Sequence, residues 1–193
     1  MTAFTLHDAE TAPDASRPLL ARTAAAWGFI PTLHATLAES PETLEAYGAL
    51  FGLVGRSTLS PVEQQVAFQA ANVLHGCEYC TMGHTVLSRR AGMDEAVLQA
   101  LREGQVLPDA RLQALRLFTE QVIRERGHAG DAAVEAFLAA GFTRANVLEV
   151  VLVVATKTIS NYVNHLTHTP KEGFMADPSL AWTAPARRPA EPA

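Results

Sequence analysis

The stretch Cys77-Glu78-Tyr79-Cys80-Thr81-Met82-Gly83-His84 decides how this sequence is interpreted, because it holds both cysteines of the chain and a histidine at helical spacing. Residues three and four apart meet on a helix surface, so Cys77, Cys80 and His84 share one face if the segment is helical. Cysteines at this spacing have Cβ atoms roughly 5–6 Å apart, and a small adjustment brings them within disulfide range. A disulfide across so short a loop removes little chain entropy, which favours a redox role over a structural one.

The thiolate is the reactive form of cysteine, and a thiol with a pKa near 8.5 is only about 3% thiolate at neutral pH. A helix N-terminus supplies typically 0.3–1 kcal/mol, whereas lowering the pKa by about 1.5 units requires roughly 2 kcal/mol. His84, one turn after Cys80, can provide the rest as an imidazolium partner or as a base. We therefore expect Cys80 to be the attacking thiol and Cys77, at the exposed end of the helix, to be the resolving thiol.

Two other interpretations of the motif stay open. A buried cysteine is often an inert small hydrophobe, and a structural zinc site would need a fourth ligand from His75, His165 or His168. No second pair of ligands has the spacing of a zinc finger, so we predict no metal ligands and no cofactor. The remaining histidines lie in loops or at helix ends and are expected to be ordinary surface or capping residues: His7, His34 and His128.

The bulk composition narrows the possible partners. The chain has 193 residues, 48% of them hydrophobic, enough for one substantial core. A formal net charge of −5 without a Lys/Arg-rich run through the body of the chain argues against nucleic acid or an anionic membrane surface. The apolar run 150–155 is far short of the roughly 18 residues that a membrane span needs. The N-terminus lacks the pattern of a secretory signal, so we expect a reducing cytoplasm, where paired cysteines are usually catalytic or metal-binding.

Glycine, proline and capping residues separate the apolar-periodic stretches, and no hairpin signal occurs, so the sequence predicts an all-α domain. Ser60-Pro61-Val62-Glu63 supplies an N-cap, a proline at the first helical position and a capping-box glutamate for a helix that extends to about Leu74. The next helix begins at or just before Cys77 and extends to about Ala91, so the thiols lie near its N-terminus. The other predicted helices span 18–27, 41–54, 94–103, 108–126, 131–140 and, after the cap Thr143, a long segment to about 168.

The last predicted helix is rich in valine and leucine and could also be a strand, but its length and the absence of a partner strand favour a buried helix. Because its middle is apolar nearly all round, we expect a homo-oligomer that buries part of it. The expected organisation is an extended N-terminal segment 1–17, a single helical domain 18–177 and a flexible tail 178–193.

At the thiol motif the sequence resembles the carboxymuconolactone decarboxylase superfamily, specifically its alkylhydroperoxidase D-like branch, whose signature is a C-x-x-C-x-x-x-H helix preceded by a Gly-terminated helix. The similarity covers residues 59–93 and 143–170, roughly a third of the chain. The resemblance implies an all-helical fold, a homo-oligomer that is often trimeric or hexameric, and a thiol-dependent peroxidase. It also implies that Cys80 attacks the hydroperoxide, Cys77 resolves, His84 joins a proton relay, and a dithiol protein returns electrons.

One position departs from the branch, which usually places a glutamate twelve residues before the first cysteine, where this chain has Gln65. An amide can orient His84 or a water but cannot exchange a proton at neutral pH. Glu63 is turned about 200° away and is expected to form the capping box, while Glu78 could substitute or serve as a first-turn anion. Either peroxidase turnover is weak or the substrate is not a peroxide.

Three classes of function follow from these observations. The first is a thiol oxidoreductase that reduces hydroperoxides. The second is a lyase or isomerase like the lactone decarboxylases of the same superfamily, which do not depend on a C-x-x-C pair. The third is a helical binding or scaffolding protein in which the motif is structural or metal-bound.

Overall fold

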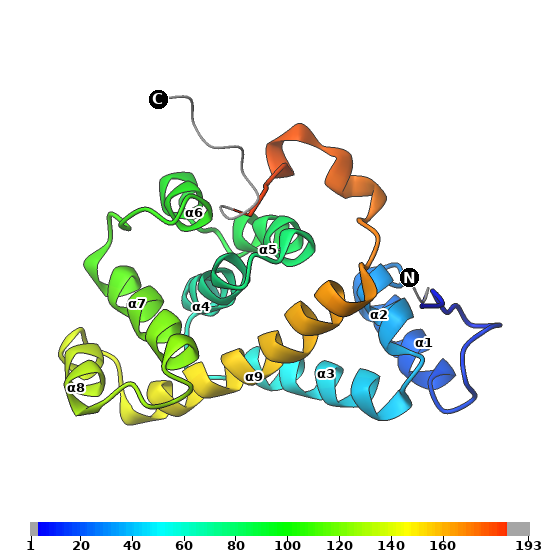
Figure 1. The fold of residues 1–193 in the computed structure, drawn as a ribbon, viewed down its shortest axis with the longest axis horizontal. Coiled ribbons are helices and arrows are strands. Elements are labelled where there is room, and N and C mark those ends of the chain that lie inside the picture. Colours follow the sequence, from blue (N-terminus) through cyan, green and yellow to red (C-terminus); the bar gives the residue numbers. More distant parts are fainter. Residues whose placement is uncertain (1–3, 185–193) are drawn as a thin grey trace.

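The computed structural model describes residues 4–184, and within them every regular element is a helix. The long final helix forms a diagonal along one side of the molecule, with the short N-terminal helices at one end and the α7–α8 pair at the other (Figure 1). The elements are α1 (Arg17–Trp27), α2 (Thr32–Leu37), α3 (Pro41–Val54), α4 (Pro61–Leu74), α5 (Glu78–Arg90), α6 (Glu95–Arg102), α7 (Ala110–Arg124), α8 (Asp131–Ala139), α9 (Arg144–Thr167), and the 3-10 turns η1 (Gly173–Ala176) and η2 (Pro178–Leu180).

The predicted all-α fold is confirmed, and the helix boundaries agree with the predictions to within two residues wherever a helix was expected. Both N-caps that the sequence indicates are present. Ser60 and Glu63 form the reciprocal capping box of α4, and Thr143 forms one with Asn146 at the start of α9. The middle of α9 is a helix and not a strand. These caps fix the starts of the two helices that flank the thiol helix.

Helix α4 is the centre of the fold and packs against α5, α7 and α9. Its apolar side chains join those of α6 to α9 in the main core, which includes Phe68, Leu98, Leu115 and Val150. A second, smaller core forms where α1, α2 and α3 meet and includes Leu20, Leu37 and Leu44. No single helix in the described part of the chain is long and apolar enough to cross a membrane, and only the sharply bent α8–α9 pair meets that test when combined.

Helix α2 was not predicted. It has six residues and begins after Pro31 without a side-chain cap. Fewer than two helical turns are too short to show a periodic pattern of apolar residues in the sequence. The N-terminal segment 4–16, which precedes α1, contains no helix. It is nevertheless packed on the domain: Ala12 and Ser16 are buried, and the backbone N–H of His7 donates to the carbonyl oxygen of Ala35 at 3.1 Å. His7 also pairs with Glu39 at 2.8 Å.

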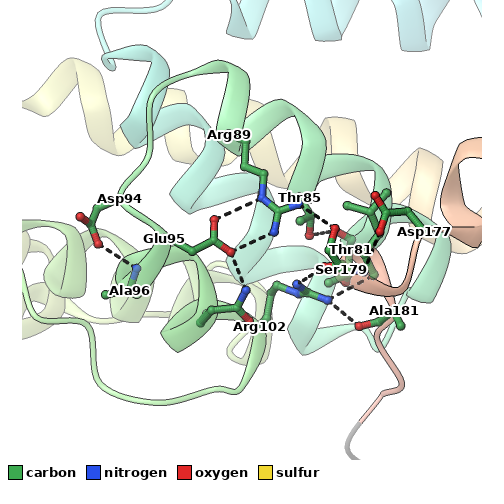
Figure 2. Close-up of polar contacts among 12 residues, drawn as sticks. Thr81, Thr85, Arg89, Asp94, Glu95, Ala96, Arg102, Asp177, Ser179 and Ala181 are labelled. Atoms are coloured by element: carbon green, nitrogen blue, oxygen red, sulfur yellow. Dashed lines mark hydrogen bonds and ion pairs between the residues drawn. The ribbon is translucent and has the colours of Figure 1, made fainter.

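The prediction of a flexible tail from residue 178 is wrong for residues 178–184. Residues 169–184 form a strap, called here the C-terminal strap, whose Leu180 and Trp182 are buried against α5. Arg102 donates to the carbonyl oxygens of Ser179, Leu180 and Ala181 at 3.2, 3.1 and 2.6 Å, as Figure 2 illustrates for this cluster. These hydrogen bonds from the charged guanidinium group hold in place a segment whose composition is typical of an unstructured tail. Residues 185–193 of the predicted tail lie outside the described residues.

Candidate active site

The two thiols lie at the N-terminus of α5, as the sequence predicts. Cys77 is the N-cap residue and Cys80 is in the first turn, and both are free thiols. Cys77 is not exposed, contrary to expectation: it is 1% exposed and Cys80 is 3% exposed. The side-chain amide of Asn164 on α9 covers them, with its nitrogen 3.1 Å from Cys80 Sγ and 3.9 Å from Cys77 Sγ. A protein partner therefore cannot reach either sulfur in this conformation.

Gln65 faces His84, as expected from the resemblance. Gln65 Oε1 lies 2.9 Å from His84 Nδ1, and because this oxygen only accepts hydrogen bonds, it places the proton of the ring on Nδ1. The other ring nitrogen, Nε2, is then an acceptor, and Lys157 Nζ lies 3.2 Å from it. The structure thus adds Lys157 to the site, as the third member of a chain that runs from Gln65 through His84.

The imidazole of His84 is neutral, so the expected imidazolium partner is not formed. The ring is 5% exposed and packs against Phe68 with centroids 4.8 Å apart. Burial lowers the pKa of His84 well below its usual value, and the positive charge of Lys157 lowers it further. The cation beside the thiols is therefore Lys157, which is only 1% exposed.

The surroundings of the two cysteines shift their pKa values in opposite directions. Burial alone would raise the pKa of Cys80, but the hydrogen bond from Cys77, the charge of Lys157 and the amide of Asn164 together lower it. The hydrogen bond to Cys80 and burial raise the pKa of Cys77. One thiol is thus stabilised as a thiolate while its neighbour keeps its proton, which is the asymmetry that an attacking and a resolving thiol require.

Buried amides hold the first turn of α5 in place. Asn161 donates to Asn72 Oδ1 at 3.1 Å, and Asn72 donates to the carbonyl oxygen of Cys80 at 3.4 Å. Gln69 donates to the carbonyl oxygen of Thr81 at 3.2 Å. This layer was not predicted, although the sequence contains a signal for it: buried polar residues of α9 recur at helical spacing, at Lys157, Asn161 and Asn164.

A cavity of about 1030 Å³ opens beside the thiols. Cys80, His84 and Lys157 line it, but Cys77 does not, so a bound molecule meets Cys80 first. The rest of the wall is largely apolar and comes from α1, α2, α3, α5 and the C-terminal strap. Its aromatic side chains are Trp27, Phe29, Tyr47, Phe51, Tyr79 and Phe174.

The expectation that His34 is an ordinary surface or capping residue is wrong. It lies on the unpredicted helix α2, lines the cavity, and has its ring edge-on to Tyr47 with centroids 5.4 Å apart. Burial lowers its pKa to about 4, against a small opposing effect from Glu172. His128, by contrast, is exposed.

The other candidates have structural roles. Glu63 closes the capping box and pairs with Arg111 at 2.9 Å, and Glu78 pairs with Lys171 at 3.3 Å. Neither replaces the missing glutamate of the relay. Within residues 4–184, no group of three or more His, Cys, Asp or Glu side chains could hold a metal ion, so His75, His165 and His168 do not complete a zinc site with the thiols.

Comparison with known proteins shows what this chain is similar to. Residues 41–121 match the Carboxymuconolactone decarboxylase family. The structure is similar to the alkylhydroperoxidase AhpD core of an uncharacterised peroxidase-related protein from Ralstonia eutropha JMP134, with a TM-score of 0.79 and 19% identity over 89% of this chain and 92% of that one. It is also similar to an uncharacterised peroxidase-related protein from Silicibacter sp. TM1040, with a TM-score of 0.75 and 22% identity over 90% and 96% of the two chains.

A third similar structure is a variant of the debrominase Bmp8 in complex with 2,3,4-tribromopyrrole, with a TM-score of 0.74 and 16% identity over 90% of this chain and 93% of that one. A search of curated proteins gives no match. The family match runs from the start of α3 into α7 and includes Gln65, the thiol motif and His84, and the structural similarity extends over about nine-tenths of the chain. The chain therefore has the alkylhydroperoxidase D-like fold, and residues 41–121 within it match the Carboxymuconolactone decarboxylase family.

Proposed function

We propose that the protein is a thiol-dependent oxidoreductase that reduces hydroperoxides through a dithiol–disulfide cycle of Cys80 and Cys77. The observation that carries this proposal is the asymmetry of the pair. Cys80 faces the cavity with a lowered pKa, and Cys77 lies behind it with a raised pKa. The thiol that a substrate meets is thus the one that is ionised, and its partner keeps the proton needed later.

In the first step the Cys80 thiolate attacks the terminal oxygen of the hydroperoxide. The O–O bond breaks, an S–O bond forms, and the departing alkoxide takes a proton to become an alcohol. Lys157 is the proposed proton donor, because it lines the same cavity as Cys80. His84 accepts a hydrogen bond from Lys157 and holds it in place, and Gln65 fixes the tautomer of His84 that can do so. His84 and Gln65 therefore position the donor.

In the second step the sulfur of Cys77 attacks the sulfenic acid of Cys80. The S–O bond breaks, hydroxide leaves as water with the proton of Cys77, and the disulfide forms. A dithiol protein would then reduce the disulfide and return one proton to Lys157. Because both sulfurs are buried, that exchange requires part of the cover to move. The strap is one such part, since its Ala184 lies against Gly76, next to Cys77.

Reductive debromination of a ring compound is a second candidate. It would use the same two thiols: a thiolate removes bromine as a sulfenyl bromide, a proton replaces it on the ring, and Cys77 displaces bromide as the disulfide forms. The observation that favours it is the cavity, which is larger than a small peroxide needs and is lined by aromatic rings. The debrominase Bmp8 shares the fold.

The test is the stoichiometry of a single turnover with reduced protein. With cumene hydroperoxide we expect one cumyl alcohol formed and two thiols lost per chain, no alcohol from Cys80→Ser, and a stalled sulfenic acid in Cys77→Ser. His128→Phe, at an exposed site, is the matched control and should behave as wild type. Bromide release from 2,3,4-tribromopyrrole without peroxide turnover would support the second candidate. Loss of no thiols with either compound would exclude both.

A further inference from the structure

The cavity beside the thiols follows one face of α5 to the end of that helix. Four of its lining residues succeed one another along α5 at spacings of three, four and three: Cys80, Gly83, Leu87 and Arg90. Residues at these spacings share a helix face, so the four form one continuous wall. A helix rises about 1.5 Å per residue, so the backbone positions of Cys80 and Arg90 are about 15 Å apart. The cavity is therefore elongated, with the attacking thiol and an arginine well separated along it.

The wall between Cys80 and Arg90 is apolar. Helix α5 contributes Gly83, Val86 and Leu87 there. The methyl group of Met175, from the C-terminal strap, lies 3.5 Å from the position that a Cβ atom would take at Gly83. These side chains carry no charge and no strong hydrogen-bonding group, so the middle of the cavity suits a hydrocarbon chain.

Three arginines line the cavity, and two of them have free guanidinium groups. Arg89 is held by Glu95 through two hydrogen bonds of 2.9 and 3.2 Å, which Figure 2 shows. Within residues 4–184, Arg22 and Arg90 form no hydrogen bond and no ion pair. Arg90 also complements the dipole of α5 from its last turn, whereas Arg22 lies in the middle of α1 and has no such role. Two cations of the wall are thus available to a ligand.

The acidic side chains of the wall are mostly engaged. Glu172 accepts a hydrogen bond from Tyr79 at 2.6 Å, and Asp177 accepts one from the backbone N–H of Ser179 at 2.8 Å. The third acid, Glu45, is exposed on α3 and pairs with no arginine in the described part of the chain. The wall therefore offers two free guanidinium groups against one free carboxylate, which favours an anionic ligand over a cationic one.

We infer that the substrate is a long-chain hydroperoxide with a carboxylate: Arg90 binds the carboxylate, the chain lies along α5, and the O–O bond lies at Cys80. Arg22 adds a second positive charge to the same cavity. Helical side chains lean towards the N-terminus, so the guanidinium group of Arg90 reaches back and the carboxylate lies about 10–15 Å from the sulfur. An extended chain advances about 1.2 Å per bond, so about eight to twelve bonds separate the two groups. The substrate class is a fatty-acid hydroperoxide oxidised near the middle of its chain.

This inference rests on the proposed function, but its first test needs no turnover. Decanoate, 1-decanol and decylamine share one chain and differ in the charge of the head group. Calorimetry gives their dissociation constants, and protection of Cys80 from iodoacetamide in a Cys77→Ser background shows that they reach the thiol. Hexanoate, whose chain is too short to span the wall, should not protect Cys80. The variants are Arg90→Met, Arg90→Lys and the pair Arg22→Met with Arg90→Met. Arg56→Met, at an exposed site outside the cavity, is the control.

We expect wild type to bind decanoate about fivefold more tightly than 1-decanol, as contacts with exposed charges allow, and decylamine most weakly. The preference for decanoate should shrink at high salt, fall in Arg90→Met, vanish in the double variant, and persist in Arg90→Lys and Arg56→Met. Equal binding of the three probes, tightest binding of decylamine, or an unchanged preference in the double variant would overturn the inference.

Turnover then separates this inference from the proposed function. Wild type should reduce 9-hydroperoxyoctadecadienoate with a kcat/KM about fivefold above that of its methyl ester, which lacks the charge. Reduction of cumene hydroperoxide without any preference for the acid would refute the inference and leave the proposed function intact. Preferential binding of decanoate without reduction of any hydroperoxide would refute the proposed function and leave the anion site.

Discussion

Replacing Lys157 with methionine removes the positive charge from the thiol site and keeps most of the side-chain volume. Lys157 is 1% exposed, and its ammonium nitrogen lies 3.2 Å from His84 Nε2. The chain has one other lysine, Lys171, whose half-exposed side chain pairs with Glu78 on the surface. Lys171→Met therefore makes the same chemical change outside the cavity and is the matched control.

The expected effect is a higher pKa for Cys80. An opposite charge within about 4–6 Å lowers the pKa of a group by roughly 1–3 units, and Lys157 is among the main groups that lower the pKa of Cys80. Without it, burial should dominate and the pKa should rise by about 1–3 units from its value of about 6, so the thiolate fraction at pH 7 should fall by about twofold to ninetyfold.

The assay is the rate of alkylation of Cys80 by iodoacetamide as a function of pH. It uses a Cys77→Ser background, so that Cys80 is the only thiol that can be alkylated. The pH at the midpoint of this profile should be higher in Lys157→Met than in wild type and unchanged in Lys171→Met. Lys157→Met leaves the buried His84 Nε2 without its hydrogen-bond donor, which costs about 1–3 kcal/mol, so the variant should unfold at a lower temperature than wild type. An unchanged midpoint in the folded variant would refute the assignment of Lys157 as the cation that activates Cys80.

Three further predictions concern the relay, pH and assembly. Gln65→Glu should place a carboxylate beside His84 Nδ1, raise the pKa of His84 and increase hydroperoxide reduction about tenfold in stopped-flow oxidation, and an unchanged or lower rate would count against a proton relay at this position. Because the pKa of His34 falls to about 4 on folding, the unfolded chain binds more protons between about pH 4 and 6.5. The free energy of unfolding should therefore drop by up to about 2 kcal/mol from pH 7 to 5, and denaturant titration of His34→Phe should show a smaller drop. We propose that copies of the chain associate through the outer face of α9, where Leu148 and Leu166 are 71% and 74% exposed. Replacing both by glutamate should lower the mass measured by light scattering, and a monomeric wild type would contradict this proposal.

The features that are predicted correctly from the sequence are those determined by residues close together in the chain. The capping box at Ser60 and the spacing of Cys77, Cys80 and His84 depend on neighbours within one or two helical turns, and the structure has both. The contact between Gln65 and His84 was also predicted, although it joins two helices, because the family resemblance supplied the packing of α4 on α5.

The missed features depend on contacts between segments that are far apart in the chain. Lys157 becomes a site residue only because α9 crosses α4 and α5, 73 positions after His84. The C-terminal strap is ordered by Arg102, whose carbonyl partners lie 77 to 79 positions away, in a segment with no periodic pattern. His34 was misjudged because its short helix leaves no periodic signal, and only the assembled cavity shows that its ring faces inward.

The central claim is that Cys80 attacks and Cys77 resolves. Its most direct test is rapid-quench mass spectrometry of the reduced protein mixed with one equivalent of cumene hydroperoxide. Wild type should lose about 2 Da as the Cys77–Cys80 disulfide forms, Cys77→Ser should gain about 16 Da at Cys80, and Cys80→Ser should keep its mass. A wild-type mass that does not change, or an oxygen adduct that forms first on Cys77, would contradict the account.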